Sequence, residues 1–203
     1  MLIRLDRVTH AFNGGHELFQ PITTPFARGE MVAVTGRSGS GKSTLLAILA
    51  GYLAPSAGAV QRGEDCRVCW VAQQPRGVAG RSALDHVALP ILATGARRSE
   101  AERRAGEFLD QLGLSDASSQ PFETLSGGQA QRLMLAQGLA AAPDVLVVDE
   151  PTAQLDHRTA AEVDAVLGML AAAELLVVVA THSPATRASC SRELALDHSI
   201  PSE

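Results

Sequence analysis

The chain has 203 residues, which suits one domain whose core is large enough to need no disulfides or structural metal. With 46% hydrophobic and 19% charged residues, the composition excludes an intrinsically disordered protein and is typical of a globular one. The 17 Lys and Arg residues against 22 Asp and Glu residues give a net charge of −5, which argues against a dedicated nucleic-acid binder.

The N-terminal segment, residues 1–7, carries charges at intervals and lacks the apolar centre of a signal peptide. No apolar run along the chain approaches the ~20 residues that a membrane-spanning helix needs. We therefore expect a chain that does not insert into a membrane by itself.

A short apolar strand is predicted over Met31–Thr35, followed by a glycine-rich segment and a helix over Lys42–Ala50. The segment reads GRSGSGKS and fits the phosphate-binding pattern G-x-x-x-x-G-K-[ST]. Its glycines let backbone N–H groups turn toward an anion, and the helix start adds a positive pole. Lys42 would reach the β- and γ-phosphates, and the Ser43 hydroxyl would bind Mg²⁺. The expected nucleotide contacts are Gly36, Arg37, Ser38, Gly39, Ser40, Gly41, Lys42, Ser43 and Thr44.

The middle of the chain is predicted to contain a strand and then a helix. The strand covers Val68–Ala72 and ends just before Gln73. The helix starts at Ser99, and Glu102 three residues later predicts a capping box. Apolar residues at helical spacing and a final glycine define its buried face and its end: Ala105, Phe108, Leu109, Leu112 and Gly113.

The sequence LSGGQ at residues 125–129 indicates a second anion site, at the start of a helix predicted over residues 128–140. A serine hydroxyl and two glycine amides at a helix start have the chemistry of a phosphate site. The plainer alternative is an ordinary N-cap at Ser126 followed by flexible glycines. Because the phosphate loop already provides one site for the triphosphate, a second site of the same kind needs an explanation.

The next predicted strand, Val145–Val148, is apolar throughout and is followed by two carboxylates. Ligands of parallel sheets bind at the carboxyl ends of the strands, where the phosphate loop also lies. Asp149 suits the Mg²⁺ shell, and Glu150 is placed to act as general base toward an attacking water. A helix and two strands are predicted beyond, over residues 163–170, 175–180 and 192–197. This alternation of strands and helices predicts an α/β fold with a largely parallel sheet.

Taken in this order, the motifs resemble those of the ATP-binding-cassette ATPases, whose signature motif is LSGGQ. The resemblance implies that the signature covers the γ-phosphate of an ATP held by the opposite subunit, through Ser126, Gly127, Gly128 and Gln129. Two Mg-ATP molecules would then lie between two subunits arranged head to tail. Every motif needed for two competent sites is present, which favours a homodimer.

The resemblance also assigns single residues elsewhere in the chain. Phe12, 24 residues before the phosphate loop, stands where the family has an aromatic ring on adenine, although an ordinary core Phe is the alternative. Gln73 matches the glutamine that contacts Mg²⁺ and the lytic water, with a one-residue ambiguity from the adjacent Gln74. His182 matches the switch histidine at the γ-phosphate, and Asp156 matches an aspartate of the dimer contact. The implied catalytic residues are Lys42, Gln73, Glu150 and His182, and the implied Mg²⁺ ligands are Ser43, Gln73 and Asp149.

The fold that the resemblance implies is one domain, a P-loop NTPase with a RecA-like core. That core would cover about 1–74 and 138–203, with a small antiparallel β edge and an inserted helical subdomain at about 75–137. The stretch between Gly58 and Gln73 is short for the family, so we expect the antiparallel edge to be reduced.

A subgroup is indicated by Val87-Ala88-Leu89-Pro90, Gly95 and Leu112-Gly113-Leu114, which resemble the lipoprotein-release and macrolide-efflux branch. This similarity implies an ATPase subunit that powers a transmembrane permease and lies on the cytoplasmic face of the cell membrane through that partner. An importer ATPase and a cassette ATPase of DNA repair or translation remain as alternatives. A small-molecule kinase would lack the signature, and no nucleic-acid partner is expected.

Overall fold

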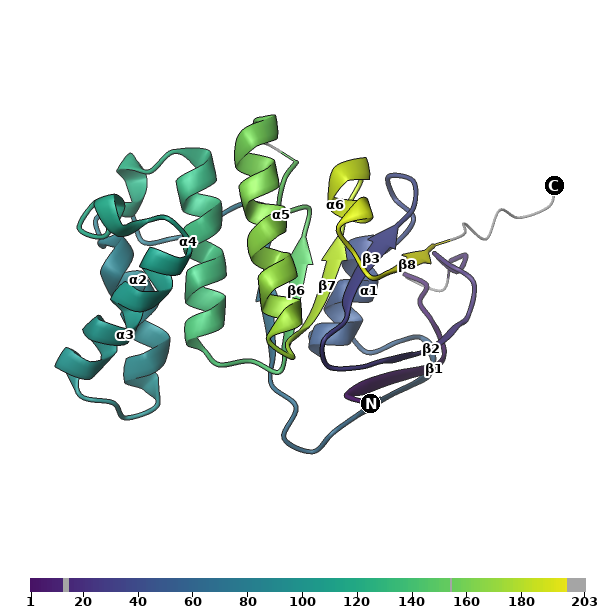
Figure 1. Ribbon diagram of the computed structural model, residues 1–203. Coiled ribbons are helices and arrows are strands. Elements are labelled where there is room, and N and C mark those ends of the chain that lie inside the picture. The colour runs from purple at the N-terminus through teal and green to yellow at the C-terminus, as the bar shows by residue number, and fades with distance from the viewer. Residues whose placement is uncertain (13–14, 154, 197–203) are drawn as a thin grey trace.

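The computed structural model describes residues 1–12, 15–153 and 155–196, which form two β-sheets flanked by helices (Figure 1). The larger sheet is parallel, with the strand order β5-β6-β7-β3-β8. Its strands are β3 (Met31–Thr35), β5 (Val68–Val71), β6 (Val145–Asp149), β7 (Leu176–Ala180) and β8 (Arg192–Ala195). The smaller sheet is antiparallel, with the order β2-β1-β4, from β1 (Ile3–Thr9), β2 (Ile22–Phe26) and β4 (Ala57–Arg62). The predicted α/β fold with a small antiparallel edge is confirmed.

The helices of the described residues are α1 (Lys42–Ala50), α2 (Ala83–Ala93), α3 (Arg98–Gln111), α4 (Gly127–Ala140), α5 (His157–Ala172) and α6 (Pro184–Ala188). Two short 3-10 turns, η1 (Ser115–Ala117) and η2 (Phe122–Thr124), precede α4. Figure 1 shows α2, α3 and α4 gathered at one end of the molecule, with α5 in front of the parallel sheet and α1 behind it.

The central strands β6 and β7 are buried along their whole length, because each is an apolar run made mainly of valine and leucine. Successive side chains of a strand point to opposite faces of the sheet. One face packs on α4 and α5 through Leu146, Val148, Val177 and Val179. The other face packs on α1 and the antiparallel sheet through Val145, Val147, Leu176 and Val178. Helices on both faces therefore hold the carboxyl ends of these strands in fixed positions.

The region at 75–137 contains α2, α3 and most of α4. These helices share one apolar cluster, which includes Val87 of α2, Ala105 of α3 and Leu133 of α4. Helix α4 continues past residue 137 to the parallel sheet, where a Cβ on Gly138 would lie 3.3 Å from both Cys69 Sγ and Leu146 Cδ1. One continuous helix thus connects the helical region to the sheet, and the division into core and subdomain stays a prediction.

The start of α3 differs from the predicted capping box. The helix begins at Arg98 after Arg97, whose side chain makes no capping hydrogen bond, and Ser99 is already inside the helix. Glu102 instead accepts a hydrogen bond from Arg98 Nε at 2.7 Å. The capping-box prediction is therefore wrong, because the Glu102 carboxylate pairs with the arginine four residues before it.

Several other boundaries move by a residue or two. The signature helix begins at Gly127 rather than at residue 128, and β5, β7 and β8 are slightly shorter than predicted. Asp197, the last residue of the final predicted strand, lies outside the described residues. In the parts of the chain that the structure describes, no helix combines the length and apolarity needed to cross a membrane.

Candidate nucleotide-binding site

A cavity of about 780 Å³, a size typical of small-molecule sites, lies where β3, β6 and β7 end. Strand β3 leads into the phosphate loop, β6 ends at Asp149 next to Glu150, and β7 leads to His182. The expected site residues that line the cavity are Phe12, Ser38, Gly39, Gly41, Lys42, Ser43, Thr44, Gln73, Asp149, Glu150 and His182. Those that do not line it are Gly36, Arg37 and Ser40, which belong to the same loop, and the signature residues 126–129.

Helix α1 begins at this cavity without a side-chain cap. Its N-cap residue, Gly41, has a φ of 92°, and no side chain in the described parts of the chain caps the first turn. A Cβ on Gly41 would lie 2.7 Å from Cδ1 of the buried Phe19. Both the left-handed backbone and the packing therefore require glycine here. The uncapped N–H groups and the positive end of the helix suit an anion such as a phosphate.

Lys42 is almost fully buried at the floor of the cavity, with 7% of its surface exposed. Its Nζ donates hydrogen bonds to the carbonyl oxygens of Gly36 at 3.2 Å and Arg37 at 3.4 Å. Nζ also lies 2.8 Å from His182 Nε2. An ammonium group has only donors, so Nε2 accepts this bond and the proton of the neutral ring sits on Nδ1. The lysine charge is thus held between the phosphate loop and His182.

Glu150 has a left-handed backbone, with a φ of 46°, which is unusual for a residue with a side chain. Its Oε2 accepts a hydrogen bond from the backbone N–H of His182 at 3.1 Å. Its Oε1 lies 3.5 Å from His182 Nε2 and is buried without a hydrogen-bond partner among the described residues. Glu150 lines this nucleotide-sized cavity, and a carboxylate there with unused acceptor capacity suits a general base that receives a proton from water.

The three expected Mg²⁺ ligands, Ser43, Gln73 and Asp149, all line this cavity and each offers it a side-chain oxygen. A hydroxyl, an amide and a carboxylate are oxygen ligands, which hard divalent cations such as Mg²⁺ prefer. Asp149 is 8% exposed, so it would meet such a cation largely shielded from water. The donor set fits Mg²⁺, which would neutralise charge on the phosphates.

The two adjacent glutamines, Gln73 and Gln74, line different cavities. Gln73 lines the nucleotide cavity, whereas Gln74 lines a second hollow between β5, α2 and α4. This geometry favours Gln73 as the site residue.

Phe12 is 55% exposed at the cavity mouth, and its ring packs edge to face on the His10 ring, with the two ring centroids 4.7 Å apart. Such an exposed ring is available for stacking on a base, in line with its expected role.

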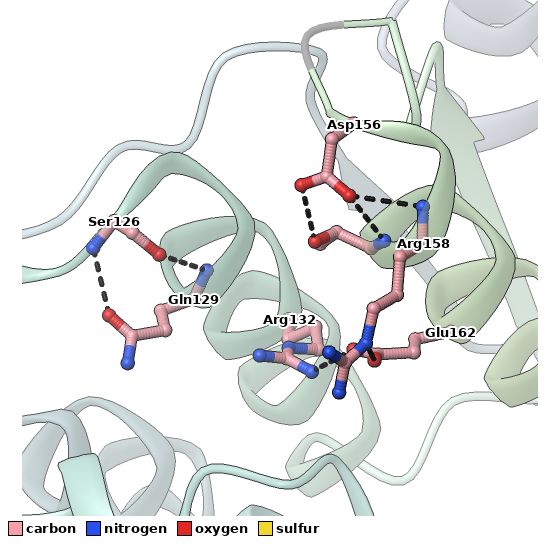
Figure 2. A network of polar contacts seen from close by, with 7 residues as sticks. Ser126, Gln129, Arg132, Asp156, Arg158 and Glu162 are labelled. Atoms are coloured by element: carbon pink, nitrogen blue, oxygen red, sulfur yellow. Dashed lines mark hydrogen bonds and ion pairs between the residues drawn. The ribbon is translucent and has the colours of Figure 1, made fainter.

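The signature stands at the start of α4 and makes a complete capping box (Figure 2). The Ser126 hydroxyl accepts a hydrogen bond from the Gln129 N–H at 3.3 Å, and Gln129 Oε1 accepts one from the Ser126 N–H at 2.9 Å. The hydroxyl keeps its own proton for another acceptor. Because the signature does not line the cavity of its own chain, any phosphate that it binds must be presented from elsewhere.

Helix α5 begins beside α4, and polar contacts join the two helices (Figure 2). Asp156 caps α5 by accepting hydrogen bonds from the N–H groups of Arg158 and Thr159, both at 3.0 Å, and from the Thr159 hydroxyl at 2.8 Å. These bonds, with those from Thr159 foremost, lower the pKa of the Asp156 carboxyl. Glu162 pairs with Arg132 of α4 at 2.7 Å and with Arg158 at 3.2 Å. The starts of α4 and α5 therefore form one continuous surface.

The cavity is also lined by residues that the sequence analysis did not assign to the site: Leu18, Thr152, Ala153, Leu155, His157, Ala160 and Ser183. Most of them flank assigned residues along the chain, since Thr152 follows Glu150 closely and Ser183 follows His182. His157 and Ala160 lie one helical turn apart at the start of α5. Adjacency to the motifs was the one signal that could have identified them.

A phosphate loop after β3 at the carboxyl edge of a parallel sheet, with two carboxylates at the end of β6 on the far side of β7, defines a P-loop ATPase. Comparison with known proteins identifies the branch. The family model for ABC transporters matches residues 19–153. The lipoprotein-releasing system ATP-binding protein LolD of Chromohalobacter salexigens is 37% identical over the whole chain and 94% of that protein. The cell division ATP-binding protein FtsE of Escherichia coli is 32% identical over 89% of the chain and 88% of that protein.

Among solved structures, the chain is similar to the ATP-binding cassette MJ0796 in a dimeric, post-hydrolysis state bound to ADP and Pi. The TM-score is 0.85 at 28% identity, covering 97% of this chain and 94% of the other. The chain therefore belongs to the ABC transporter ATP-binding family. As a member of this family it binds Mg-ATP and hydrolyses ATP.

Proposed function

We propose that the chain works as a homodimer that holds two Mg-ATP molecules and powers a transmembrane permease of the lipoprotein-release type. The observation that carries this proposal is the position of Ser126 and its helix start, outside the cavity of their own chain. Two subunits arranged head to tail would bring each signature to the other's nucleotide. The dimeric MJ0796 structure and the similarity to LolD support this arrangement.

In the proposed reaction, the residues of this chain bind ATP and move one proton. Lys42 exchanges the carbonyl oxygens of Gly36 and Arg37 for the terminal phosphates, and the uncapped N–H groups of α1 bind phosphate oxygens. Glu150 accepts a proton from the attacking water, and His182 is held beside it by the bond from its backbone N–H. Mg²⁺, held by Ser43, Gln73 and Asp149, would offset the charge of the phosphates.

We place the contact with the permease in the second hollow, which has a volume of about 380 Å³. Its lining includes Ala72 and Gln74, the two neighbours of Gln73, which is the expected contact of Mg²⁺ and water, and it is bordered by both β5 and the helical region. Its lining combines apolar side chains with one cation: Trp70, Pro90 and Met134 with Arg76. Docking there would keep the chain peripheral, on the cytoplasmic face of the cell membrane.

An ATPase of a cell-division system is the second candidate function, because FtsE matches almost as much of the chain as LolD does. The two functions differ in the membrane protein that is bound. Purification of the tagged chain from its own cells, followed by identification of the membrane protein that accompanies it, distinguishes them.

The substitution Glu150→Gln tests the proposed dimer. Glutamine keeps the size of the side chain but cannot accept the proton, so hydrolysis should fall ~10²- to 10⁴-fold while ATP binding persists. ATP should then hold the variant as a dimer that ADP does not support, as measured by size-exclusion chromatography with light scattering.

Lys42→Ala is the control, because it removes the cation at the phosphates and should stay monomeric with either nucleotide. A Glu150→Gln variant that binds ATP and remains monomeric would refute the homodimer. One that hydrolyses ATP at the wild-type rate would remove Glu150 as the base.

A further inference from the structure

A buried carboxylate lies behind the catalytic loops, on the inner face of α5. Asp164 is only 6% exposed, and it forms no ion pair with any of the residues that the structure describes. Its Oδ2 accepts a hydrogen bond from the Thr186 hydroxyl at 3.0 Å, while its Oδ1 is buried without a partner among the described residues. Burial raises the pKa of this carboxyl, and the Thr186 bond opposes that rise only in part.

The hydrogen bond to Asp164 continues toward the nucleotide cavity. Thr186 Oγ1 lies 3.1 Å from Thr152 Oγ1, and both threonines are buried. Thr186 has a single hydroxyl proton, which it gives to Asp164, so Thr152 donates to Thr186. Thr152 stands two residues after Glu150, and Thr186 lies on α6, four residues after His182. These two hydrogen bonds form a relay of Thr152, Thr186 and Asp164. The relay joins the loop after β6, the helix after β7 and α5.

Stability does not account for a carboxyl in this position. A buried carboxyl without a cation destabilises a fold, and an apolar set of the same size is often neutral or better. The neighbouring thiol experiences the same environment, since burial and the charge of Asp164 raise the pKa of Cys190 to about 11. An unfavourable group with one well-formed bond, directed at the two catalytic loops, indicates a role in function.

We propose that Asp164 is a positioning residue, which through Thr186 and Thr152 holds the loop of Glu150 at a fixed distance from the loop of His182. The proposal rests on the functions assigned to Glu150 and His182 above. At the front, those two residues are joined by the bond from His182 N to Glu150 Oε2 at 3.1 Å. The relay joins the same two loops at the back. With both connections in place, the loop of Glu150 and the loop of His182 are held together at two points, and the Glu150 carboxylate keeps its place at the cavity.

The sharpest test is the double variant Asp164→Leu with Thr186→Val, which replaces both partners with apolar groups of similar size. It should melt close to the wild-type temperature, because the pair itself leaves no unsatisfied buried group and only the Thr152 hydroxyl loses its acceptor. Its kcat should fall ~10- to 100-fold, because a displaced base loses alignment with its water. The Kd for ATP should stay within about twofold, since the phosphate loop is untouched.

Asp164→Asn provides the conservative rescue, because its amide oxygen still accepts from Thr186, and its kcat should stay within about threefold of wild type. Asp110→Asn is the matched control. The Asp110 carboxylate, near the end of α3, also accepts a hydrogen bond from a hydroxyl, that of Ser115, and neither residue lines the cavity. Should the double variant not fold, Thr186→Val alone must show the same loss of kcat.

Three results with these variants would overturn the proposal. A double variant with wild-type kcat overturns the proposal, and so does one whose melting temperature, Kd and kcat all decline together, since that describes a merely structural role. Asp164→Asn with the same loss as the double variant also overturns it. The Glu150→Gln chain is assayed in parallel. If it is as active as wild type, the assigned base is wrong; if it is inactive while the double variant is active, only the relay is wrong.

Discussion

Two helices of this chain begin with phosphate-type sequences, yet their first turns are built differently. Helix α1 starts at Gly41 with no side-chain cap and opens directly on the nucleotide cavity. Helix α4 starts at Ser126 with both hydrogen bonds of a capping box and lies outside that cavity. The first start is incomplete until an anion arrives, because its N–H groups need an acceptor. The second is complete in the isolated chain, so a ligand adds to it without being needed for its folding.

The glycines at the two starts show the same contrast. Position 41 needs glycine because its φ is 92° and a Cβ there would clash with Phe19. Position 128 needs glycine because a Cβ there would lie 2.6 Å from Thr159 Cγ2 of α5. A Cβ on Gly127 would have no neighbouring atom of the described residues within 4 Å, and the backbone there is not left-handed. Within the part of the chain that the structure describes, nothing thus demands glycine at 127. Such a position suits close approach by a ligand from outside the chain.

The largest effect is expected when the two starts are damaged in separate chains. Lys42→Ala disables the cavity and Ser126→Arg disables the signature, so each variant alone should lose nearly all hydrolysis. A mixture should recover activity, because each mixed dimer contains one site with an intact lysine and an intact serine. Steady-state ATPase rates across mixing ratios measure the recovery. Failure to recover at every ratio would mean that Ser126 does not act across a dimer.

An intermediate effect is expected from alanine at the two glycines. Gly41→Ala should destabilise the fold by about 1–3 kcal/mol, because the backbone is strained and the methyl meets Phe19. Gly127→Ala should be neutral or stabilise by about 0.5 kcal/mol, as alanine does in a helix, yet slow hydrolysis ~10-fold or more by crowding the partner's nucleotide. Urea unfolding and ATPase assays give both values. Unimpaired hydrolysis in Gly127→Ala would weaken the case for close approach.

The smallest effect concerns α5, whose cap is a carboxylate rather than a hydroxyl. Hydrogen bonds lower the pKa of Asp156 in the folded state, so its contribution to stability is present above the ordinary pKa of 3.8 and is lost as the pH falls through the lowered value. Asp156→Asn keeps a capping oxygen that does not titrate. The difference in melting temperature between wild type and variant should therefore be greatest near neutral pH and shrink below pH 3.8. A constant difference from neutral pH to well below that value would contradict this.

Sequence patterns predicted the parts of the fold that depend on short-range chemistry. The buried run Val145–Val148 and the helix Lys42–Ala50 were evident, because unbroken apolar residues and a phosphate loop each specify a local structure. The antiparallel edge was expected from the family resemblance alone, because strands such as β2, which is short, half exposed and contains Pro25, leave no clear pattern. The choice of Gln73 over Gln74 also came from the resemblance, and the separate cavities that the two residues line give it a geometric reason. The relay through Asp164 could not be predicted, because its three residues come from separate segments with no shared motif.

The unbroken course of α4 has a mechanical consequence. One end carries the signature at Gly127, and the other end borders the second hollow through Met134, Gln137 and Gly138. At 1.5 Å per residue, its 14 residues form a rod of ~21 Å with no proline along it to bend. A tilt of ~10° about Gly138, which lies ~16 Å along the helix from Gly127, would move the signature by ~3 Å, about the length of a hydrogen bond. If a membrane protein docks at this hollow as proposed, a small push there would be enough to make or break a contact between Ser126 and a phosphate.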